Sequence, residues 1–587
     1  MSEIRVPVLI VGGGGAGLAM SIFLSDHGID HLLVERHQGT SILPKAHYLN
    51  QRFMEVMRQH GVADAIYAGG APTHQMSAVA WYTSLGGDGE LDGKTLHKMD
   101  AFGGGDTAER YLRDSPCRST NYPQLRLEPV LRGVAEQRAP GRVLFHHEMT
   151  AMSQDENGVR ATILNRDTDA EFVVLADYLV GADGGKTVGA MIGAEMFGPN
   201  NLINIVSTQF TADLSQWWED DVLIAHFLNA DAGSYPAGGN LVPLGPTWGK
   251  HSQEWQFHFA FLPTDEPDTT PESLVPKICE LLKVGDIDLK VLNVSQWFVE
   301  GRVASKFGQG RVFLVGDAAH KHPPTTGLGL NTCVQDSHNL AWKLAAVLKG
   351  QADPSLLNTY EAERLPIAFR VVDWAMMTMQ NHFVVDSGIG MMPIPLPPEM
   401  YHAIFQVFFS DSPMGETRRA RFREVVETQR VEFQAHDLEI GFSYPQGALV
   451  ADGTTAPPTD PMGSIYHPTS RPGHRLPHAW LEAAGQRLST HDFVGRTGGF
   501  ALITGPDSSA WKKAADQAAE KFGIDITVAA IGSDYSDIDG QWERVREIGS
   551  DGAILVRPDN HVCWRSMDAA VQNVESFVGA VAAVLGR

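Results

Sequence analysis

The sequence predicts an α/β protein of about two to four domains, because 587 residues are too many for a single hydrophobic core. Three observations indicate this fold class. A glycine-rich turn follows an apolar strand near the N-terminus, which is typical of a parallel sheet. Residues 202–262 alternate between polar and apolar side chains, as antiparallel strands do. After Phe442, three short strands and one helical stretch predict a separate, smaller α/β domain.

The first element is a strand that runs into a glycine turn and a helix. Val8 to Val11 are apolar, and Gly12, Gly14 and Gly17 then fit the pattern G-x-G-x-x-G before a helix-like run. Glu35 ends the next apolar strand, 23 residues after Gly12. Glycines allow close approach to a pyrophosphate at the helix N-terminus, and the acid accepts hydrogen bonds from ribose hydroxyls. This spacing predicts a Rossmann-type dinucleotide site; the alternative is a glycine turn in another α/β fold.

The rest of the chain contains no second unit of this kind, since the GGGD segment at 103–106 is not followed by an apolar helix. A single dinucleotide that stays bound favours a flavin over a nicotinamide. The strand VFLVGD ends in Asp317, whose carboxylate can accept hydrogen bonds from the ribityl hydroxyls of a flavin.

The segment after Asp317 predicts a rigid wall and a helix N-terminus. Pro324 follows another proline and fixes an extended chain, and Gly327 permits close backbone approach. The helical run that follows leaves free N–H groups at its start, which could stabilise negative charge on a flavin ring; these belong to Gly329, Leu330 and Asn331. His320 and His322 lie nearby without a third ligand at metal spacing, so we expect them to pack around the turn.

Composition and charge restrict the kinds of partner. With 43% hydrophobic and 20% charged residues, the chain is typical of a globular protein. Its net charge of −24 argues against nucleic acid or an anionic membrane as partners. We expect a cytoplasmic protein without membrane segments, since no apolar stretch reaches ~20 residues and no secretion signal precedes the first strand. The cysteines have neither C-x-x-C nor metal spacing, which favours free thiols and no metal site: Cys117, Cys279, Cys333 and Cys563.

Several motifs together resemble a known family. The run GRVFLVGDAAHKHPPTTGLGLN is similar to the second FAD-binding motif of single-component flavoprotein aromatic hydroxylases, the p-hydroxybenzoate hydroxylase group. The segment GADGGKT, which contains Asp183, resembles that group's D-G motif for FAD and nicotinamide binding. Segments at 44–61, 115–131 and 466–481 resemble the phenol 2-monooxygenase and 2,4-dichlorophenol 6-monooxygenase branch. The resemblance covers nearly the whole chain.

The resemblance implies a domain plan. Residues 1–190 would form the first part of the FAD domain, with part of the substrate layer near 70–115. Residues 191–300 would form an antiparallel-sheet substrate domain, and 301–440 the rest of the FAD domain with further helices. Residues 441–587 would form a thioredoxin-like domain that lacks C-x-x-C, so a packing or dimer-forming role is left for it. A homodimer or higher homo-oligomer is expected.

The resemblance also implies a reaction. NADPH or NADH would reduce bound FAD, O2 would form a flavin C4a-hydroperoxide, and a phenol would be hydroxylated ortho to its hydroxyl group, giving a catechol. Two alternatives remain open: a hydroxylase of a polycyclic aromatic polyketide, and a flavin-binding scaffold without turnover. An apolar substrate pocket is expected in the segment between the D-G motif and the second FAD-binding motif. Four tryptophans lie in this segment, and each of them either lines the pocket or belongs to the core of the sheet: Trp217, Trp218, Trp248 and Trp255.

Five residues receive candidate roles, from their positions in the family motifs or from their neighbours in the sequence. His47 is the candidate base that accepts the phenol proton, or a structural histidine near the flavin. Asp114 would orient His47 or the substrate, or is a surface-loop aspartate. Gln124 would contact FAD or is a polar loop residue, and Arg36 would meet the adenosine or is surface charge. Lys45 stands where the family usually has an arginine near the flavin. Gly189 and Ala190 stand where the family's D-G motif usually ends in Val-Arg.

Overall fold

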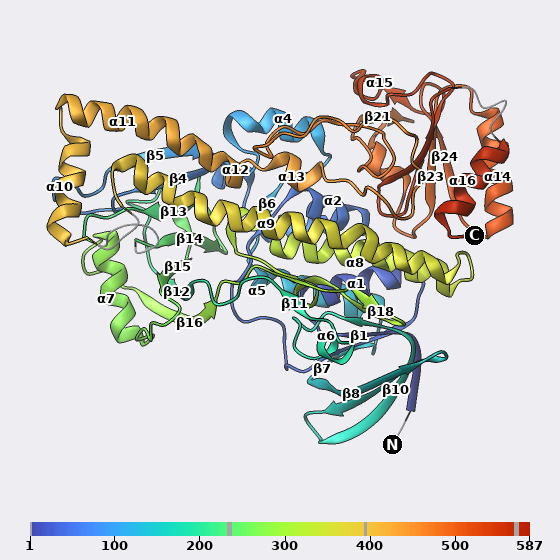
Figure 1. The fold of residues 1–587 in the computed structure, drawn as a ribbon, viewed down its shortest axis with the longest axis horizontal. Coiled ribbons are helices and arrows are strands. Elements are labelled where there is room, and N and C mark those ends of the chain that lie inside the picture. The colour runs from blue at the N-terminus through green and yellow to red at the C-terminus, as the bar shows by residue number, and fades with distance from the viewer. Residues whose placement is uncertain (1–2, 232–237, 393–395, 569–573) are drawn as a thin grey trace.

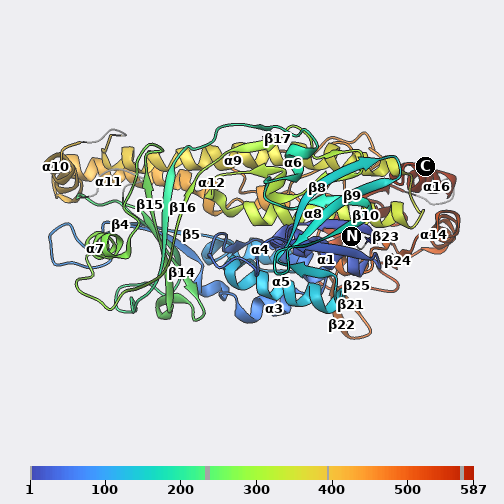
Figure 2. The same cartoon turned by 90° about the horizontal axis from the view of Figure 1, so that it is seen from below.

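A computed structural model describes residues 3–231, 238–392, 396–568 and 574–587. The molecule is elongated, with the sheet that contains β12–β16 at one end, a largely parallel sheet in the middle and the C-terminal domain at the other end (Figure 1). Helix α9 (Asn358–Ile389) runs along most of this length in both views (Figures 1 and 2). No helix in the described ranges is both long and apolar enough to span a lipid bilayer.

The predicted parallel sheet is present in the order β18-β19-β10-β1-β2-β7. Helices α1, α5 and α8 pack together beside it. Strands β1, β2, β7, β10 and β19 run parallel, so their carboxyl ends lie at one edge of the sheet. The elements are β1 (Glu3–Val11), α1 (Gly15–Asp26), β2 (His31–Glu35), α5 (Gln124–Arg138), β7 (Val143–Phe145), β8 (His147–Asp155), β9 (Gly158–Asn165), β10 (Ala170–Gly181), β18 (Gly308–Gln309), β19 (Val312–Leu314) and α8 (Gly329–Leu348).

The segment at 202–262 forms antiparallel strands, as its alternation predicts, although residues 232–237 lie outside the described part. The sheet has the order β16-β12-β15-β14-β13-β4-β5 and contains two strands from before residue 101. Its outer face packs on α7, where Trp255 and Phe257 meet Leu274 and Ile278. The elements are β4 (Ala78–Tyr82), β5 (Thr95–Asp100), β12 (Asn204–Thr211), β13 (Val222–Phe227), β14 (Asn240–Gly245), β15 (Glu254–Phe261), α7 (Pro271–Leu282) and β16 (Lys290–Phe298).

Short elements connect the two sheets to the long helices. The strand predicted at VFLVGD ends earlier, at Leu314, and Gly316–Ala318 form a single 3-10 turn. Asp317 therefore lies in a turn beyond the sheet edge. The remaining elements before residue 441 are β3 (Tyr48–Leu49), α2 (Gln51–Gln59), α3 (Ala63–Gly69), α4 (Ala108–Asp114), β6 (Thr120–Asn121), α6 (Val188–Met191), β11 (Met196–Phe197), β17 (Arg302–Ala304), β20 (His320–Lys321), α10 (Pro398–Phe409), α11 (Pro413–Val426), α12 (Arg430–Phe433) and α13 (His436–Ile440).

The C-terminal domain has the predicted strand–helix–strand unit followed by a hairpin. Its sheet has the order β24-β23-β26-β27, in which β23 and β24 are parallel and the other pairs antiparallel. Helices α14 and α16 pack together. The elements are β21 (Trp480–Ala483), β22 (Gln486–Ser489), β23 (Phe500–Thr504), α14 (Ser509–Phe522), β24 (Ile526–Ala530), β25 (Ser536–Asp537), α15 (Gln541–Val545), β26 (Ala553–Val556), β27 (Val562–Ser566) and α16 (Val574–Val584).

Candidate active site

The glycine turn after β1 is closed so tightly that side chains cannot enter it. Gly12 has a φ of +116°, and a Cβ there would lie 2.2 Å from the Ala182 carbonyl oxygen. A Cβ on Gly17 would lie 1.9 Å from the Gly12 carbonyl oxygen. Gly14 precedes the first residue of α1 and has no side chain that could cap the helix N-terminus, which is where a pyrophosphate binds in folds of this kind. Glu35 lies beside this turn and accepts a 2.7 Å hydrogen bond from the Gly13 N–H.

The N-terminus of α8 meets that of α1. A Cβ on Gly15 would lie 2.5 Å from Leu330, so the two helix starts are in contact there. Among the described residues, the backbone N–H groups of Gly329, Leu330 and Asn331 have no hydrogen-bond acceptor, as expected of a helix start. The Asn331 side chain is buried and donates to the carbonyls of Tyr48 and Gly327. Two converging helix starts favour negative charge between them.

Three further candidate residues surround this edge. Asp317 is exposed and, apart from a long contact with the Cys333 thiol at 3.5 Å, its carboxylate is free of described partners. Pro324 is exposed immediately before the turn that contains Gly327. Gly327 has a φ of +64°, and a Cβ there would lie 2.9 Å from the Tyr48 ring.

Other candidates have their side chains in different surroundings. The Asp183 carboxylate accepts hydrogen bonds from the backbone N–H groups of Gly185, Thr187 and Val188, so it holds the turn into α6. Lys45 is exposed, with a φ of +45°. Arg36 is half-buried, and its side chain has no polar partner among the described residues. Direct contacts of these three side chains with a cofactor stay predictions.

Sequence reasoning missed Glu128, which organises the same edge. Its Oε1 accepts from the Gly15 N–H at 3.1 Å and from the Gln124 side chain at 2.5 Å. Its Oε2 accepts from the Ser41 N–H at 2.7 Å, beside an open groove of about 540 Å³ lined by Gly39–Ile42 and α5. Glu128 therefore fixes Gln124 and the groove wall against α1.

These features fit FAD. The turn without side chains fits its pyrophosphate, and Glu35 at the end of β2 fits its ribose. Exposed Asp317 after β19 fits the ribityl chain, and the two converging helix N-termini fit the ring. The residues that would hold FAD are the glycines of the turn, Glu35, Asp317 and the three residues at the start of α8.

His47 lies beside this edge, where β3 pairs with β6. Its Nδ1 and the Asn121 Oδ1 are 2.7 Å apart, while the Asn121 amide nitrogen donates to the Pro243 carbonyl on β14. Burial lowers the pKa of His47, and the hydrogen bond to Asn121 partly opposes this. The imidazole is therefore neutral near pH 7, and its Nε2 has no hydrogen-bond partner among the described residues.

A row of polar side chains crosses the inner face of the seven-stranded sheet. Cross-strand register places Ser207, His258, Asn240 and His226 side by side on β12, β15, β14 and β13. His258 lies near enough to His47 for a positive charge on His47 to lower the pKa of His258. This face is opposite the one packed on α7, so the sheet presents the polar row towards the side occupied by His47.

The predicted role of Asp114 in orienting His47 is wrong in this structure. Asp114 is 5% exposed and is the last residue of α4, so it is not a surface-loop residue either. Its carboxylate pairs with Arg113 and accepts from His436 Nε2 at 3.1 Å. Burial raises its pKa, but the hydrogen bonds and charges of these two partners lower the pKa below its usual value. The partner of His47 is Asn121.

The tryptophans singled out from the sequence do not form a shared pocket. The Trp218 and Trp255 rings lie 4.9 Å apart in the outer core. Trp217 packs at the edge of that core, and Trp248 donates to the Gly69 carbonyl. Trp297, on β16, is instead the tryptophan bonded to the polar row, through Ser207.

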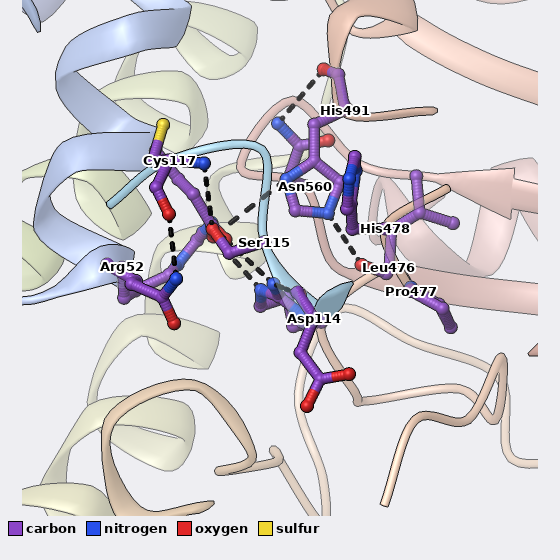
Figure 3. A network of polar contacts seen from close by, with 12 residues as sticks. Arg52, Asp114, Ser115, Cys117, Leu476, Pro477, His478, His491 and Asn560 are labelled. Atoms are coloured by element: carbon purple, nitrogen blue, oxygen red, sulfur yellow. Dashed lines mark hydrogen bonds and ion pairs between the residues drawn. The ribbon is translucent and has the colours of Figure 1, made fainter. Parts of the chain in front are cut away.

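A buried polar network joins this region to the C-terminal domain (Figure 3). Arg475 donates to both Glu55 oxygens, at 2.7 and 3.0 Å, and to the Asp114 carbonyl at 2.6 Å. Ser115 donates to Glu55 at 2.6 Å. Figure 3 shows Asp114, Ser115 and Cys117 on one side of the junction, and Leu476, His478 and His491 on the other. Arg475 thus ties α2, which follows His47, to the segment that leads to Asn121.

The fold and this edge define an FAD-dependent aromatic-ring hydroxylase. Residues 5–375 match the FAD binding domain family, and residues 469–587 match the family of aromatic-ring hydroxylase C-terminal domains. The chain belongs to this family.

Full-length relatives agree with this assignment. A 2,4-dichlorophenol 6-monooxygenase of Delftia acidovorans is 36% identical, covering 96% of this chain and 95% of the relative. A phenol 2-monooxygenase of Pseudomonas sp. (strain EST1001) is 35% identical, covering 96% and 90%. A tetracenomycin A2 monooxygenase-dioxygenase of Streptomyces glaucescens is 33% identical, covering 96% and 94%. Among solved structures, the flavin-dependent monooxygenase PieE in complex with FAD and substrate is 37% identical, with a TM-score of 0.93 over all of both chains.

Proposed function

We propose that this FAD-dependent monooxygenase uses NAD(P)H and O2 to hydroxylate a phenolic ring ortho to its hydroxyl group. Bound FAD supplies the electron transfer from NAD(P)H and the activated oxygen. The chain's residues must then bind the ring, exclude water and accept the phenolic proton. Relatives named for phenol and dichlorophenol support the substrate class.

The observation that carries this proposal is the 2.7 Å hydrogen bond between His47 Nδ1 and Asn121 Oδ1, from which the tautomer of His47 follows. The Asn121 amide nitrogen donates to a carbonyl, so its Oδ1 is the atom that faces His47. An amide oxygen only accepts, so His47 Nδ1 must carry the hydrogen. His47 Nε2 is then a bare acceptor, able to take a hydrogen bond or a proton from a phenol.

This assignment gives each residue a task. Asn121 orients the ring of His47 and fixes its tautomer, and β14 holds Asn121 through the Pro243 carbonyl. The low pKa of His47 keeps the ring neutral before substrate binds, so the acceptor is present across the neutral pH range. A phenol has an ordinary pKa near ~10, and its anion attacks electrophilic oxygen far more readily than the neutral ring does.

One observation favours a larger, polycyclic substrate as the second candidate. From β12 to β13 the polar row spans three strand spacings, roughly 14 Å, which is longer than one phenol ring. At its far end both ring nitrogens of buried His226 lack a partner among the described residues. A second polar substituent on a fused-ring substrate would satisfy one of them.

The test is NADH and NADPH oxidation by the purified flavoprotein with a panel of aromatics, with product analysis. The panel contains phenol, 2,4-dichlorophenol, a bulky ortho-substituted phenol and a polycyclic phenol. Fast oxidation with a catechol product supports the phenol proposal. Coupled oxidation with the polycyclic compound alone supports the second candidate. Failure of every phenol to stimulate oxidation would contradict both.

A further inference from the structure

His258 shares the inner face of the sheet with Ser207 and Trp297. The Ser207 Oγ lies 2.8 Å from His258 Nδ1 and accepts a hydrogen bond from the Trp297 Nε1–H at 2.9 Å. All three residues come from adjacent strands, β15, β12 and β16. Their alignment is therefore fixed by the sheet and not by a loop.

This chain of hydrogen bonds sets the tautomer of His258. Ser207 is buried, and its hydroxyl has one hydrogen to donate. That hydrogen cannot go to Trp297, because an indole N–H only donates. Among the described residues, His258 Nδ1 is the one acceptor within hydrogen-bond distance of that hydroxyl. The hydroxyl must then donate to Nδ1, since an unpaired buried hydroxyl is costly. The remaining hydrogen of the neutral imidazole lies on Nε2, which has no partner in the described ranges.

His47 and His258 thus present opposite functions. His47 offers a bare nitrogen, and His258 offers an N–H. Burial, followed by the influence of His47, lowers the pKa of His258 to about 3, so His258 stays a neutral donor. A phenolic oxygen can donate its proton to the first ring and accept a hydrogen bond from the second.

We propose that His258 is a second catalytic histidine, whose Nε2–H binds the phenolate oxygen, and that Ser207 and Trp297 are positioning residues that hold it in this tautomer. The proposal rests on the proposed phenol hydroxylation. The phenol O–H bond breaks, its proton passes to His47 Nε2, and the electron pair stays on the oxygen that His258 hydrogen-bonds.

The need for a second group follows from the burial of His47. Because burial makes imidazolium unfavourable there, proton transfer from a phenol to His47 alone is opposed. A hydrogen bond to the anionic oxygen stabilises the product of that transfer and not the neutral phenol. The two histidines together favour the anion where His47 alone does not.

The experiment measures the ionisation of 4-nitrophenol bound to the holoenzyme, without NAD(P)H, by difference absorbance across pH. The wild type should bind the yellow anion and lower the apparent pKa of the ligand. His258→Phe keeps a ring but removes the donor, so it should raise that pKa by about one to two units and weaken anion binding about 10- to 100-fold. His258→Gln retains an N–H donor and should restore much of the effect.

Ser207→Ala tests the tautomer with His258 intact. It frees Nδ1 to carry the hydrogen, so the ligand pKa should rise as in His258→Phe, though by less. Ser295→Ala is the matched control, since Ser295 pairs with Ser207 in register but has no described hydrogen bond to His258. It should leave the ligand pKa unchanged.

The outcomes separate the two proposals. A wild type that binds no nitrophenolate contradicts the proposed phenol chemistry, and with it the role of His258. A wild type that binds the anion, with an unchanged ligand pKa in His258→Phe and Ser207→Ala, overturns the role of His258 and leaves phenol hydroxylation standing. If His258→Phe does not retain flavin, the pKa of the ligand bound to Ser207→Ala decides whether His258 has this role.

Discussion

Replacing Arg475 by methionine should destabilise the protein strongly, because Arg475 neutralises a buried carboxylate across a domain junction. The Glu55 side chain is 2% exposed and that of Arg475 is fully buried. Burial alone raises the pKa of Glu55, but Arg475, His491 and Arg52 together lower it well below its usual range. Methionine fills similar volume and leaves Glu55 with one fewer charge partner. Breaking a buried pair in this way costs about 3 to 5 kcal/mol.

The same junction provides a matched control. Arg58 lies on α2, as Glu55 does, and makes a bidentate ion pair with Asp492 of the C-terminal domain, at 2.9 and 3.1 Å. These side chains are 38% and 31% exposed, so Arg58→Met should cost only about 0 to 1 kcal/mol. Both pairs join the same two parts of the chain. The difference between the two losses of stability therefore reports the effect of burial.

The assay is guanidinium unfolding followed by tryptophan fluorescence, with flavin release recorded in parallel. Arg475→Met should unfold at clearly lower denaturant than Arg58→Met. Adding Glu55→Gln to Arg475→Met removes the unpaired charge and should recover part of the loss. Equal destabilisation by Arg475→Met and Arg58→Met would refute the reasoning that burial makes the Arg475 pair strong.

Three further predictions concern the site. His47→Ala should lower the coupled hydroxylation rate about 10²- to 10⁴-fold at an unchanged flavin content; an unchanged product-formation rate would remove the base assignment. Gly12→Ala should abolish flavin retention, measured as the absorbance ratio of flavin to protein, because its Cβ would lie 2.2 Å from a carbonyl oxygen. Burial raises the pKa of Glu439 to about 8, with the Tyr48 hydrogen bond opposing it. The folded state then holds a proton that the unfolded state releases near pH 4.5, so stability falls as pH rises towards 8; Glu439→Gln should flatten this slope in thermal midpoints measured from pH 5 to 9.

The sequence predicts the glycine turn and the starts of α1 and α8 well because each of their signals is local. Gly12, Gly14 and Gly17 stand within one turn, and the strand and helix that flank them have clear periods. The start of α8 is equally visible, since glycines precede a long run with helical spacing. Such features depend on backbone geometry that neighbouring residues determine, so they can be recognised without the fold.

The polar partners in the site could not be recognised in the same way. His47 and Asn121 are 74 residues apart, and Asp114 and His436 are 322 apart, so only the folded chain pairs them. One signal was available for His258. In the strand QFHFAF, Phe257 and Phe259 alternate with it, which places His258 on the face opposite the apolar core.

The C-terminal domain contacts the FAD-binding part of the chain through buried ion pairs. It inserts Arg475 and Arg557 into the FAD-binding part, where they pair with Glu55 on α2 and with Glu363 on α9. All four side chains are at most 2% exposed. Through Arg475, which bonds Glu55 and the Asp114 carbonyl, the domain helps to hold α2 and the segment that leads to Asn121 in place beside His47.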